Sequence, residues 1–521
     1  MNLEGEASTV GWARWGAGTN AKTLPDTAST LLAQVLDLAP PPPVVPLAEV
    51  AVADCALDGA VLGALRRALG PDNVLTTRVA RARHGSGMST PDLLRHRQGR
   101  VPAAPQAVLR PGDHAEVLSI LDICSRFGVA VVPFGGGTSV VGGLTPSATR
   151  HVAVDLGRLN GLVAVDPLSR TATLQAGLRA PRAAELLAEH GFTMGHVPQS
   201  YEYATIGGFA ATRSSGQASA GYGRFDDMVT ALTIATPRGT IRTGRAPASA
   251  AGPDLRHLFL GSEGTLGVIT DVTVRIRPLP ARSHYEGWRF ASFADGLHAV
   301  RSLAQDGPRP TVLRLSDEAE TMIGATGSGR SDGGCQLIAG YEGADVRPTV
   351  EAAAAVLAAH GGVPLGEESG RQWARHRFDA PYLRDALLDA GAFAETVETA
   401  AYWSALPEVH DRVRQAILGA LPDAALVLAH VSHVYETGAS LYFTVICSPG
   451  SDPIERWRRA KAAASDAIAA AGATISHHHG VGTDHRAWYA AEIGDVAVDL
   501  LRAVKQQLDP AGILNPGILV P

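Results

Sequence analysis

Residues 131–144 read VVPFGGGTSVVGGL, a stretch that places five glycines and two hydroxyl side chains directly after an apolar run. A lone glycine pair is most simply a turn that needs positive φ. Three successive glycines followed by Thr138 and Ser139 instead leave a row of unshielded backbone N–H groups, and such a concavity binds anions. The stretch therefore predicts a loop that holds a phosphate or pyrophosphate.

The elements around this loop disfavour the two common nucleotide-binding folds. Helical spacing of apolar residues predicts a helix over 114–127, and residues 129–134 read as a buried strand that enters the loop. In a Rossmann unit the glycine turn opens a helix, but residues 138–147 have neither a capped start nor helical periodicity. The G-x-G-x-x-G count from Gly135 ends at Val140, and no Walker lysine follows. We therefore expect no nicotinamide dependence.

The pattern around the loop predicts an α+β domain. A helix begins at Pro181, and β-type runs occupy residues 151–156, 162–166, 171–177, 229–237 and 271–280, the last of which Pro278 ends. Beyond residue 281 the elements lengthen, which indicates a second domain. An Ala-rich helix there begins at Pro453 after an Asp452 cap and ends near Gly472.

Composition narrows the class of protein. A chain of 521 residues exceeds the size of one hydrophobic core, so two or three domains are expected. A hydrophobic content of 45% and a net charge of −6 are typical of a soluble globular protein and not of a nucleic-acid binder. The four scattered cysteines predict neither disulfides nor a zinc site. No apolar run is long enough for a bilayer span, so we expect a cytoplasmic protein whose membrane contact is peripheral.

Two more glycine-rich segments, residues 195–227 and 261–270, lie next to predicted strands. Three such loops suit a large cofactor held by main-chain atoms. In order and wording, PFGGGTS, ATIGGFAATRSSG and GSEGTLGVIT resemble the FAD-binding domain of the vanillyl-alcohol oxidase and p-cresol methylhydroxylase (PCMH) superfamily. The segments GHVPQSYEYATIGG, YLRDALLDAGAFAETVET, SLYFTVI and SHHHGVG are similar to the alkyldihydroxyacetonephosphate synthase (alkylglycerone-phosphate synthase) family, flavoenzymes that make the ether bond of ether lipids.

The resemblance covers almost the whole chain and implies its organisation. It implies a mostly helical N-terminal region (1–101), a two-subdomain PCMH-type FAD-binding domain (102–281), an α+β cap that binds substrate (282–475) and a C-terminal active-site and helical segment (476–521). It also implies a homodimer.

The resemblance further implies which residues contact FAD. The glycine loop takes the pyrophosphate, and the other segments line the adenine and the isoalloxazine. The cofactor is non-covalent, because the loop has no histidine where covalent relatives carry one. At Gln199 the family usually has Asp, so one negative charge is missing near the flavin. The implied contacts are Pro133, Phe134, Gly135, Gly136, Gly137, Thr138, Ser139, Gln199, Ser200, Tyr201, Glu202, Tyr203, Ala204, Thr205, Thr212, Arg213, Ser214, Ser215, Glu263, Gly264, Thr265, Leu266, Gly267, Val268 and Ile269.

Three further residues match family positions that act on substrate. The two-residue period of a strand puts Tyr442 and Thr444 on one face, so Tyr442 is either an aromatic on a polar strand face or, by resemblance, the residue that transfers a proton at the substrate carbon. Arg384 either pairs with Asp385 or Asp389 or, by resemblance, binds the substrate phosphate. Arg314 also matches an arginine on which the family depends.

His477, His478 and His479 are three consecutive imidazoles. Successive residues of an extended segment point to opposite sides, and no Cys or carboxylate stands at ligand spacing, so we expect no metal site. By resemblance they belong to the active site, where they orient Tyr442 and the anionic headgroup.

The family's reaction exchanges the acyl chain of acyl-dihydroxyacetone phosphate for a fatty alcohol, with FAD oxidised at its start and end. The alternative is an FAD-dependent D-2-hydroxy acid dehydrogenase or oxidase of the D-lactate or glycolate type. Those enzymes usually have an acidic residue before the histidine (EHG), where this chain reads HHHG. A non-catalytic flavin or lipid carrier has no use for Tyr442, Arg384 and the histidines together.

Overall fold

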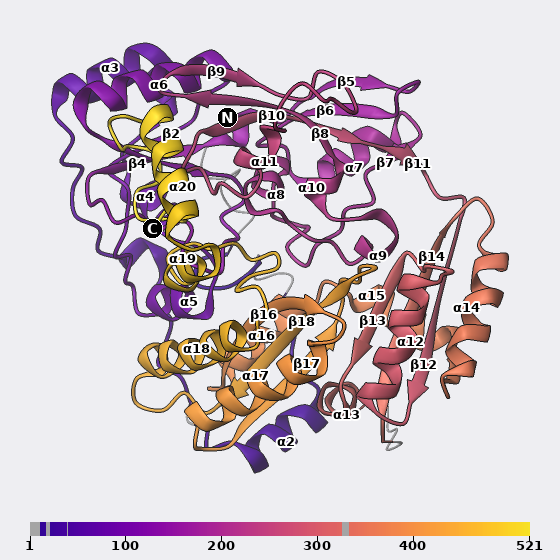
Figure 1. Cartoon of the computed structure of the whole chain (residues 1–521). Coiled ribbons are helices and arrows are strands. Elements are labelled where there is room, and N and C mark those ends of the chain that lie inside the picture. The colour runs from indigo at the N-terminus through magenta and orange to yellow at the C-terminus, as the bar shows by residue number, and fades with distance from the viewer. Residues whose placement is uncertain (1–10, 17–20, 39, 326–332) are drawn as a thin grey trace.

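The computed structural model describes residues 11–16, 21–38, 40–325 and 333–521, and every structural statement below concerns these residues. The architecture is α+β, as predicted (Figure 1). Two hydrophobic cores divide most of the buried side chains between a half that carries the glycine loops and a half built on a large antiparallel sheet.

The first glycine loop follows the edge strand of a small sheet. Asp113 accepts a hydrogen bond from the Glu116 N–H at the start of helix α6, and Gly128 ends that helix at φ 60°. Residues 135–147 after the strand form turns and irregular structure, as predicted, and no helix. The strand order is β1 (Val74–Leu75), β2 (Val108–Leu109), β4 (His151–Asp155) and β3 (Ala130–Phe134), with the last three parallel, and α6 (His114–Phe127) packs against them.

A five-stranded antiparallel sheet carries the loop that contains Glu263. Its central strand is broken after Arg275, because Arg277 and Pro278 pair with residues 192–193 and not with the sheet. The predicted single strand over 271–280 is therefore wrong in its bounds. The order is β5 (Leu162–Asp166), β6 (Thr171–Gln175), β10 (Val268–Arg275), β8 (Val229–Thr236) and β9 (Gly239–Arg242), with β11 (Arg277–Pro278) beside β7 (Phe192–Thr193).

Short helices complete this half. They are η5 (Leu156–Arg158), α7 (Ala180–Ala188), α8 (Ile206–Thr212), α9 (Ser219–Tyr222), α10 (Phe225–Met228) and α11 (Arg256–Phe259).

A seven-stranded antiparallel sheet forms the second half. Helices α17 and α18 pack on the face of β18 that carries Leu441, Phe443 and Val445, all fully buried. These helices leave the other face of β18 uncovered, on the side of the glycine loops. The order is β15 (Val363–Gly366), β12 (Arg282–Phe290), β14 (Cys335–Gly343), β13 (Val312–Ser316), β17 (Ala425–Val431), β18 (Gly438–Cys447) and β16 (Phe393–Tyr402).

The helices of this half are α12 (Phe293–Gln305), α13 (Glu318–Ala325), α14 (Arg347–Ala359), α15 (Glu367–His376), α16 (Ala380–Asp389), α17 (Leu406–Ala420) and α18 (Pro453–Ala470). Helix α18 confirms the expected Asp452 cap, whose side chain accepts from the Glu455 N–H.

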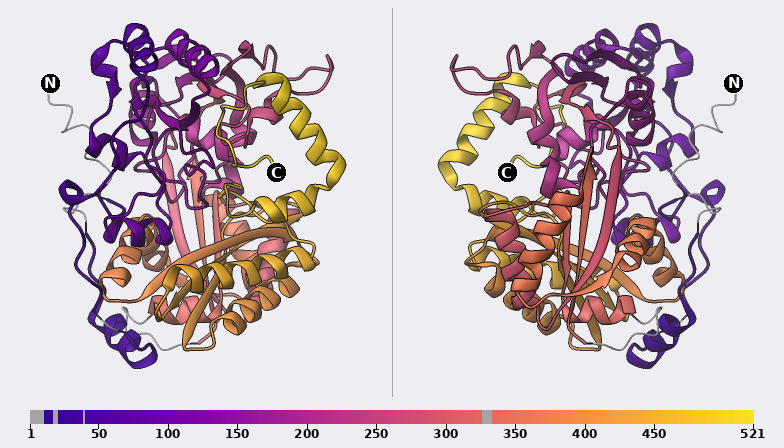
Figure 2. Two further views of the ribbon diagram at one scale, coloured as in Figure 1. Left: turned by 90° about the vertical axis from the view of Figure 1, so that its left-hand side faces the viewer. Right: turned by 90° about the vertical axis from the view of Figure 1, so that its right-hand side faces the viewer.

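The N-terminal residues divide between the two halves. Leu32 of α2 and Leu36, which follows that helix, pack with Leu428 and Ile446 of the large sheet, whereas α3 lies in the core of the half that carries the glycine loops (Figure 2). Besides β1, the described elements before residue 101 are α2 (Asp26–Val35), η3 (Leu47–Glu49), α3 (Gly59–Leu69), η4 (Pro71–Asn73), α4 (Arg78–Arg83) and α5 (Thr90–Arg97).

The C-terminal residues return to the first glycine loop. After α19 (Arg486–Ile493) and α20 (Asp495–Leu508), the Val131 N–H donates to Ile513 O at 2.8 Å and the Asn515 N–H donates to Val131 O at 2.9 Å. The end of the described chain thus lies beside the strand that enters the loop.

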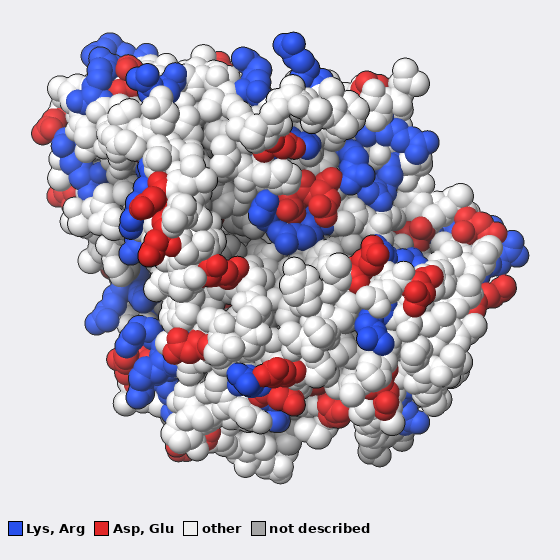
Figure 3. All heavy atoms as spheres, in the orientation of Figure 1, with Lys and Arg blue, Asp and Glu red and all other residues white. Residues whose placement is uncertain are grey.

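None of the described helices combines the length and apolar character that a bilayer span requires. On the face drawn in Figure 3, basic and acidic side chains are interspersed.

Candidate active site

The structure brings the first two of the segments predicted to contact FAD into backbone contact. A Cβ built on Gly136 would lie 2.1 Å from the Tyr203 carbonyl oxygen, and one on Gly135 would lie 2.4 Å from Thr205 Oγ1. Either clash is impossible for a real side chain, so both positions require glycine. The loop at 135–137 and the segment 199–205 therefore form one close-packed cradle.

The third and fourth segments join the same cradle. A Cβ on Gly264 would lie 2.7 Å from Pro133 Cγ, and one on Gly261 would lie 3.0 Å from Arg213 Cδ. The Glu263 N–H donates to Ala211 O at 3.0 Å. All four segments that the sequence assigned to FAD thus lie against one another.

The backbone of the glycine loop keeps free donors. Among the described residues, the N–H groups of Gly136, Gly137 and Thr138 donate to no protein acceptor. Because peptide donors rarely remain unpaired without water or a ligand, this row fits the anionic pyrophosphate of a dinucleotide. The residues present therefore fit FAD, with main-chain atoms as the binding groups.

Gln199 lies in a chain of amides near this cradle. Its Oε1 accepts from Gln217 Nε2 at 3.4 Å, and Gln217 Nε2 also donates to the Arg377 carbonyl at 2.8 Å. The Gln199 Nε2 is buried and has no partner among the described residues. The amide is thus free to donate where the family's aspartate could only accept.

Tyr442 projects from β18 on the face opposite α17, as the alternation predicts. Its ring stacks on His430 at 5.0 Å between centroids and on His478 at 6.0 Å, with interplanar angles of 22° and 18°. His479 meets it edge-on at 5.6 Å. Tyr442 therefore lies inside a cluster of imidazoles.

Burial raises the pKa of Tyr442 to about 12, while a hydrogen bond with Thr396 and the charge of Arg384 act in the opposite direction. The phenol is therefore neutral at physiological pH, and Arg384 lies within electrostatic reach of it. A protonated phenol in this place can donate a proton to a bound substrate.

Glu398 holds the histidine segment in place. Its side chain is fully buried, and its oxygens accept hydrogen bonds from the N–H groups of His477, His478 and His479 at 2.8, 3.1 and 3.0 Å, and from Ser476 Oγ at 2.7 Å. Burial opposes ionisation of Glu398, but the surrounding histidines and the backbone donors outweigh it and keep its pKa well below the usual value. One buried carboxylate thus fixes three successive residues.

The histidines themselves are neutral. Burial lowers the pKa of His477 and of His478, and it lowers the pKa of His479 to about 3. They can therefore accept a proton or a hydrogen bond from Tyr442 or from substrate, as the expected orienting role requires.

Arg384 has two donors that make no hydrogen bond. Its Nη1 donates to Met88 O at 2.6 Å, and its Nη2 forms the expected ion pair with Asp385 Oδ1 at 3.8 Å, a separation longer than a hydrogen bond. Its Nε and Nη2 are buried without a hydrogen-bond partner among the described residues. Because a buried guanidinium is costly unless its donors are used, this arrangement fits an anionic ligand.

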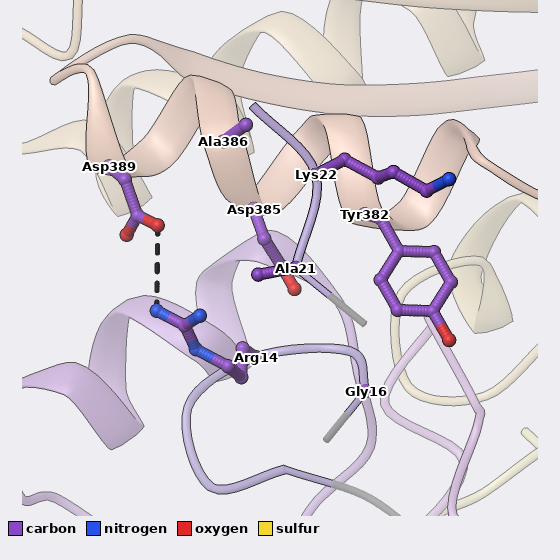
Figure 4. Close-up of a pocket in the computed structure, with 8 residues that line it drawn as sticks. All are labelled: Arg14, Gly16, Ala21, Lys22, Tyr382, Asp385, Ala386 and Asp389. Carbon is purple, nitrogen blue, oxygen red and sulfur yellow. Dashed lines mark hydrogen bonds and ion pairs between the residues drawn. The ribbon is translucent and has the colours of Figure 1, made fainter. Parts of the chain in front are cut away.

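The helix that carries Arg384, α16, is braced by the N-terminal segment. The Trp15 N–H donates to Asp385 Oδ2 at 2.6 Å, and Asp389 pairs with Arg14 at 3.4 Å and with Arg97 at 2.8 Å. Figure 4 shows this segment crossing the helix face that bears Tyr382, Asp385 and Asp389. Asp389 is therefore not the partner of Arg384.

Arg314 contacts the site indirectly. Its Nη2 lies 2.9 Å from Glu320 Oε1 and 3.0 Å from His430 Nδ1. Burial would raise the pKa of Glu320, but His430 and Arg314 outweigh it and hold that pKa at about 2. Arg314 thus reaches Tyr442 through the stacked ring of His430.

Sequence reasoning missed Glu398, His430, His433 and Glu320. The two histidines belong to AHVSH, residues 429–433, at the end of β17 and in the loop that leads to β18, the strand of Tyr442. Glu398 belongs to the ETVET segment. These two histidines stand just before the segment SLYFTVI, which resembles the family, and could therefore have been predicted as site residues from the sequence. The role of Glu398 could not have been, because its partners lie 78–81 residues away.

Two family models match the chain. The model described as FAD binding domain covers residues 105–245, and the one described as FAD linked oxidases, C-terminal domain, covers residues 279–519. Both match the order of the two halves seen in the structure.

Individual proteins extend the similarity. The chain is 31% identical over 484 residues to an alkyldihydroxyacetonephosphate synthase of Dictyostelium discoideum, over 87% of this chain and 79% of that one. It is 30% identical over 441 residues to a mitochondrial D-lactate dehydrogenase (cytochrome) of Saccharomyces cerevisiae, over 79% of this chain and 72% of that one. The synthase match is the longer.

Solved structures agree. An alkyldihydroxyacetonephosphate synthase structure superposes with a TM-score of 0.84 at 27% identity, over 98% of this chain and 99% of that one. A p-cresol methylhydroxylase structure, at 17% identity, gives a TM-score of 0.70 over 90% of this chain and 98% of that one, which shows the predicted superfamily fold alone. On this identity, coverage and shared fold, the chain belongs to the alkyldihydroxyacetonephosphate synthase family, and FAD is its cofactor.

Proposed function

We propose that this protein exchanges the acyl chain of acyl-dihydroxyacetone phosphate for a fatty alcohol, as an FAD-dependent alkyldihydroxyacetonephosphate synthase. The proposal rests on one observation: two buried donors of Arg384 make no hydrogen bond to the described residues, and the Tyr442 phenol lies within electrostatic reach of the Arg384 charge. A phosphorylated headgroup bound by Arg384 would place its neighbouring carbon near Tyr442.

The bond changes balance without an outside oxidant. The bond between C1 and the ester oxygen breaks, the oxygen leaves with the fatty carboxylate, and the alcohol oxygen forms the new ether bond to C1 while its proton is released. When bound, FAD would supply an isoalloxazine ring able to accept electron density from C1 and to return it.

The chain's own residues supply binding and proton transfer. Arg384 holds the phosphate by charge-assisted hydrogen bonds. A neutral imidazole of His478 or His479 accepts the phenol proton of Tyr442, and the resulting phenolate removes a proton at C1 and returns it. His478 and His479 contact both the ring of Tyr442 and the segment that Glu398 fixes, so they hold the phenol in its reacting orientation. Burial of the cluster keeps water from the reacting carbon.

The alternative is a flavin dehydrogenase of D-2-hydroxy acids. His478 stands where those enzymes usually carry an acidic residue, which supports the exchange reaction. Product analysis by mass spectrometry, with palmitoyl-dihydroxyacetone phosphate and hexadecanol under anaerobic conditions without dye, tests the choice. Ether product in balance with released palmitate, and no peroxide, is expected. Sustained dye reduction by D-lactate without ether product would replace the proposal by the alternative.

A homodimer, peripheral contact with membranes and a cytoplasmic location belong to the same proposal. The apolar chains of both substrates support membrane contact. Light scattering of the purified protein and flotation with phosphatidylcholine vesicles test the first two.

A further inference from the structure

A second cluster of histidines lies beside the Tyr442 site. His433, His477 and His478 each offer one ligand nitrogen, and the three nitrogens lie within 4.8 Å of one another. We propose that these three imidazoles bind a borderline divalent cation of the zinc class. The proposal goes beyond the exchange reaction and does not depend on it.

The expectation of no metal site assumed that three consecutive histidines must converge. The structure uses a different set. His479 points toward the edge of Tyr442 and stays outside the group, while His433 enters from the turn between β17 and β18. The geometric objection therefore does not apply to the cluster that the fold assembles.

The backbone of every member is fixed before any ion binds. The His433 N–H donates to Ser440 Oγ at 3.2 Å and its carbonyl accepts from the Ser440 N–H at 2.8 Å. Glu398 holds the N–H groups of His477 and His478. Ligands so held lose little entropy on binding.

Hydrogen bonds orient two of the rings. His433 Nδ1 lies 2.8 Å from Ser219 Oγ, and His477 Nε2 lies 2.6 Å from Tyr435 Oη. The bond to Tyr435 leaves His477 Nδ1 to face His478 Nδ1, and the bond to Ser219 uses one ring nitrogen of His433 and leaves the other for a ligand role. Metal-binding histidines typically have their second nitrogen hydrogen-bonded in this way. The rings of His433 and His477 stack at 5.0 Å with an interplanar angle of 18°.

The spacing suits a tetrahedral ion. Two nitrogens bound to zinc at about 2.05 Å lie about 3.4 Å apart. His477 Nδ1 and His478 Nδ1 are 3.0 Å apart, so this pair needs a few tenths of an ångström of ring movement, and the His433 nitrogen, within 4.8 Å of both, closes the remaining distance when the ion binds. Three protein nitrogens leave the fourth position to water or substrate.

The charges and the ligand chemistry also fit. Neutral, buried imidazoles are the form that binds zinc, copper, iron and nickel, whereas magnesium and calcium prefer oxygen. The Glu398 carboxylate lies 3.5 Å from His478 Nδ1 and offsets part of the ion's charge. Arg224, whose charge also acts on His477, is paired with Asp226 at 3.0 Å.

The test uses tag-free, FAD-loaded full-length protein, because a polyhistidine tag would itself bind the probe. After chelation and desalting, Zn²⁺ is titrated calorimetrically, and bound metal is counted by plasma mass spectrometry. We expect one equivalent of Zn²⁺ per chain, lost in His433→Gln and retained in the matched control His479→Gln. Co²⁺ should give tetrahedral absorption bands beyond the flavin spectrum, and only in proteins that keep His433.

FAD content and circular dichroism report whether His433→Gln folds. If it does not fold, Ser219→Ala removes only the outer hydrogen bond and should weaken Zn²⁺ binding by about 10- to 100-fold. The proposal is overturned if the wild-type protein binds no stoichiometric Zn²⁺, because His477 and His478 then form a plain imidazole hydrogen bond. It is equally overturned if His433→Gln, or Ser219→Ala where the former is unfolded, binds Zn²⁺ as tightly as the wild type.

Discussion

At the scale of single residues, the site depends on groups whose ordinary properties are altered by burial. The Tyr442 phenol is held protonated among neutral histidines, and Arg384 keeps a buried charge with two unused donors. The unused donors of the buried guanidinium cost folding free energy unless a ligand accepts from them. Substitutions at these two positions therefore separate chemistry from binding.

Tyr442→Phe keeps the ring and its stacking on His430 but removes the hydroxyl. We expect FAD content and folding to persist while kcat falls by about 10²- to 10⁴-fold, the usual share of a general acid–base group. Steady-state kinetics of ether formation measure it. Tyr341→Phe, a buried tyrosine on β14 of the same sheet whose hydroxyl bonds Glu286, serves as the control and should keep full activity. A turnover of Tyr442→Phe within a few-fold of the wild type would assign Tyr442 to packing alone.

Arg384→Lys keeps a charge but loses the planar fork of donors. It should raise KM for the phosphorylated substrate more than it lowers kcat, because binding and not the chemical step is weakened. Arg97→Lys is the matched control: Arg97 is also buried and pairs with Asp389 of the same helix, so its loss should lower thermal stability and leave KM unchanged. If Arg384→Lys lowered thermal stability and left KM unchanged, Arg384 would be the partner in a structural ion pair and not a substrate-binding residue.

At the scale of elements, two buried glutamates connect segments that are distant in the chain. Glu398 of β16 holds the histidine segment, and Glu263 of the last FAD loop accepts hydrogen bonds from the Val481 and Gly482 N–H groups at 2.7 and 2.9 Å. Burial raises the pKa of Glu263 to about 7, whereas that of Glu398 is held well below its usual value. The two should therefore give stability changes of opposite sign with pH.

Glu398→Gln should lower the free energy of unfolding at neutral pH by about 3 kcal/mol, since a charged acceptor of several buried donors is lost. A carboxylate with a depressed folded pKa stabilises above its unfolded pKa, and this stability is lost as pH falls through the folded pKa. The difference between wild type and variant should therefore shrink as pH falls below about 4.5. Urea unfolding across pH measures it.

Glu395→Gln is the matched control for Glu398, because Glu395 is a buried glutamate of the same strand whose pKa burial raises. Its pH dependence should run in the opposite direction. If both variants changed alike with pH, the assigned charge state of Glu398 would be wrong.

Glu263→Gln removes a buried carboxyl group whose ionisation lowers the free energy of unfolding as pH rises. With a folded pKa of about 7 and an unfolded value of 4.5, the folded state binds more protons between these values, so unfolding free energy falls as pH rises through this window. The loss amounts to about 3 kcal/mol by linkage. Thermal denaturation from pH 4.5 to 7.5 should give a flatter curve for the variant. Parallel curves would show that Glu263 stays ionised.

At the scale of the whole molecule, the segments that the sequence assigns to FAD lie where the two halves and the C-terminal segment converge. Glu263 of a FAD loop contacts the residues that follow the histidines, and Asn515 Nδ2 donates to Gly143 O and Glu263 O at 3.1 and 2.8 Å. Loading with FAD should therefore stabilise the molecule as one unit, because a ligand that binds only the folded state adds to its stability.

The purified protein should be yellow and should release its flavin on acid or heat precipitation. The glycine loop offers no histidine for covalent attachment, and Cys55, Cys124, Cys335 and Cys447 lie in no flavin-attachment motif that the sequence shows. Absorbance of the supernatant at flavin wavelengths measures the release. Colour that remained with the precipitated chain would reveal a covalent bond.

Local sequence determines most of the glycine-loop cradle and, in the catalytic cluster, the strand face on which Tyr442 lies. The requirement for glycine at 135–137 and the alternation of 441–445 follow from backbone sterics and from the two-residue period of a strand, which act within a few residues. Tyr442 and its face could therefore be predicted. The break of the strand after Arg275 could not, because it depends on pairing with residues 192–193.

Only the tertiary structure decided which groups surround Tyr442. Glu398 and His430 come from the two strands that flank β18, and His433 comes from the turn before it. Their effect depends on register across the sheet and not on spacing along the chain. Burial then set their protonation, since desolvation keeps the imidazoles neutral while converging N–H donors keep one carboxylate charged. Neither register nor desolvation is encoded in any short stretch of sequence. For this reason the sequence predicted His477, His478 and His479 as site residues but not Glu398, the carboxylate that holds them.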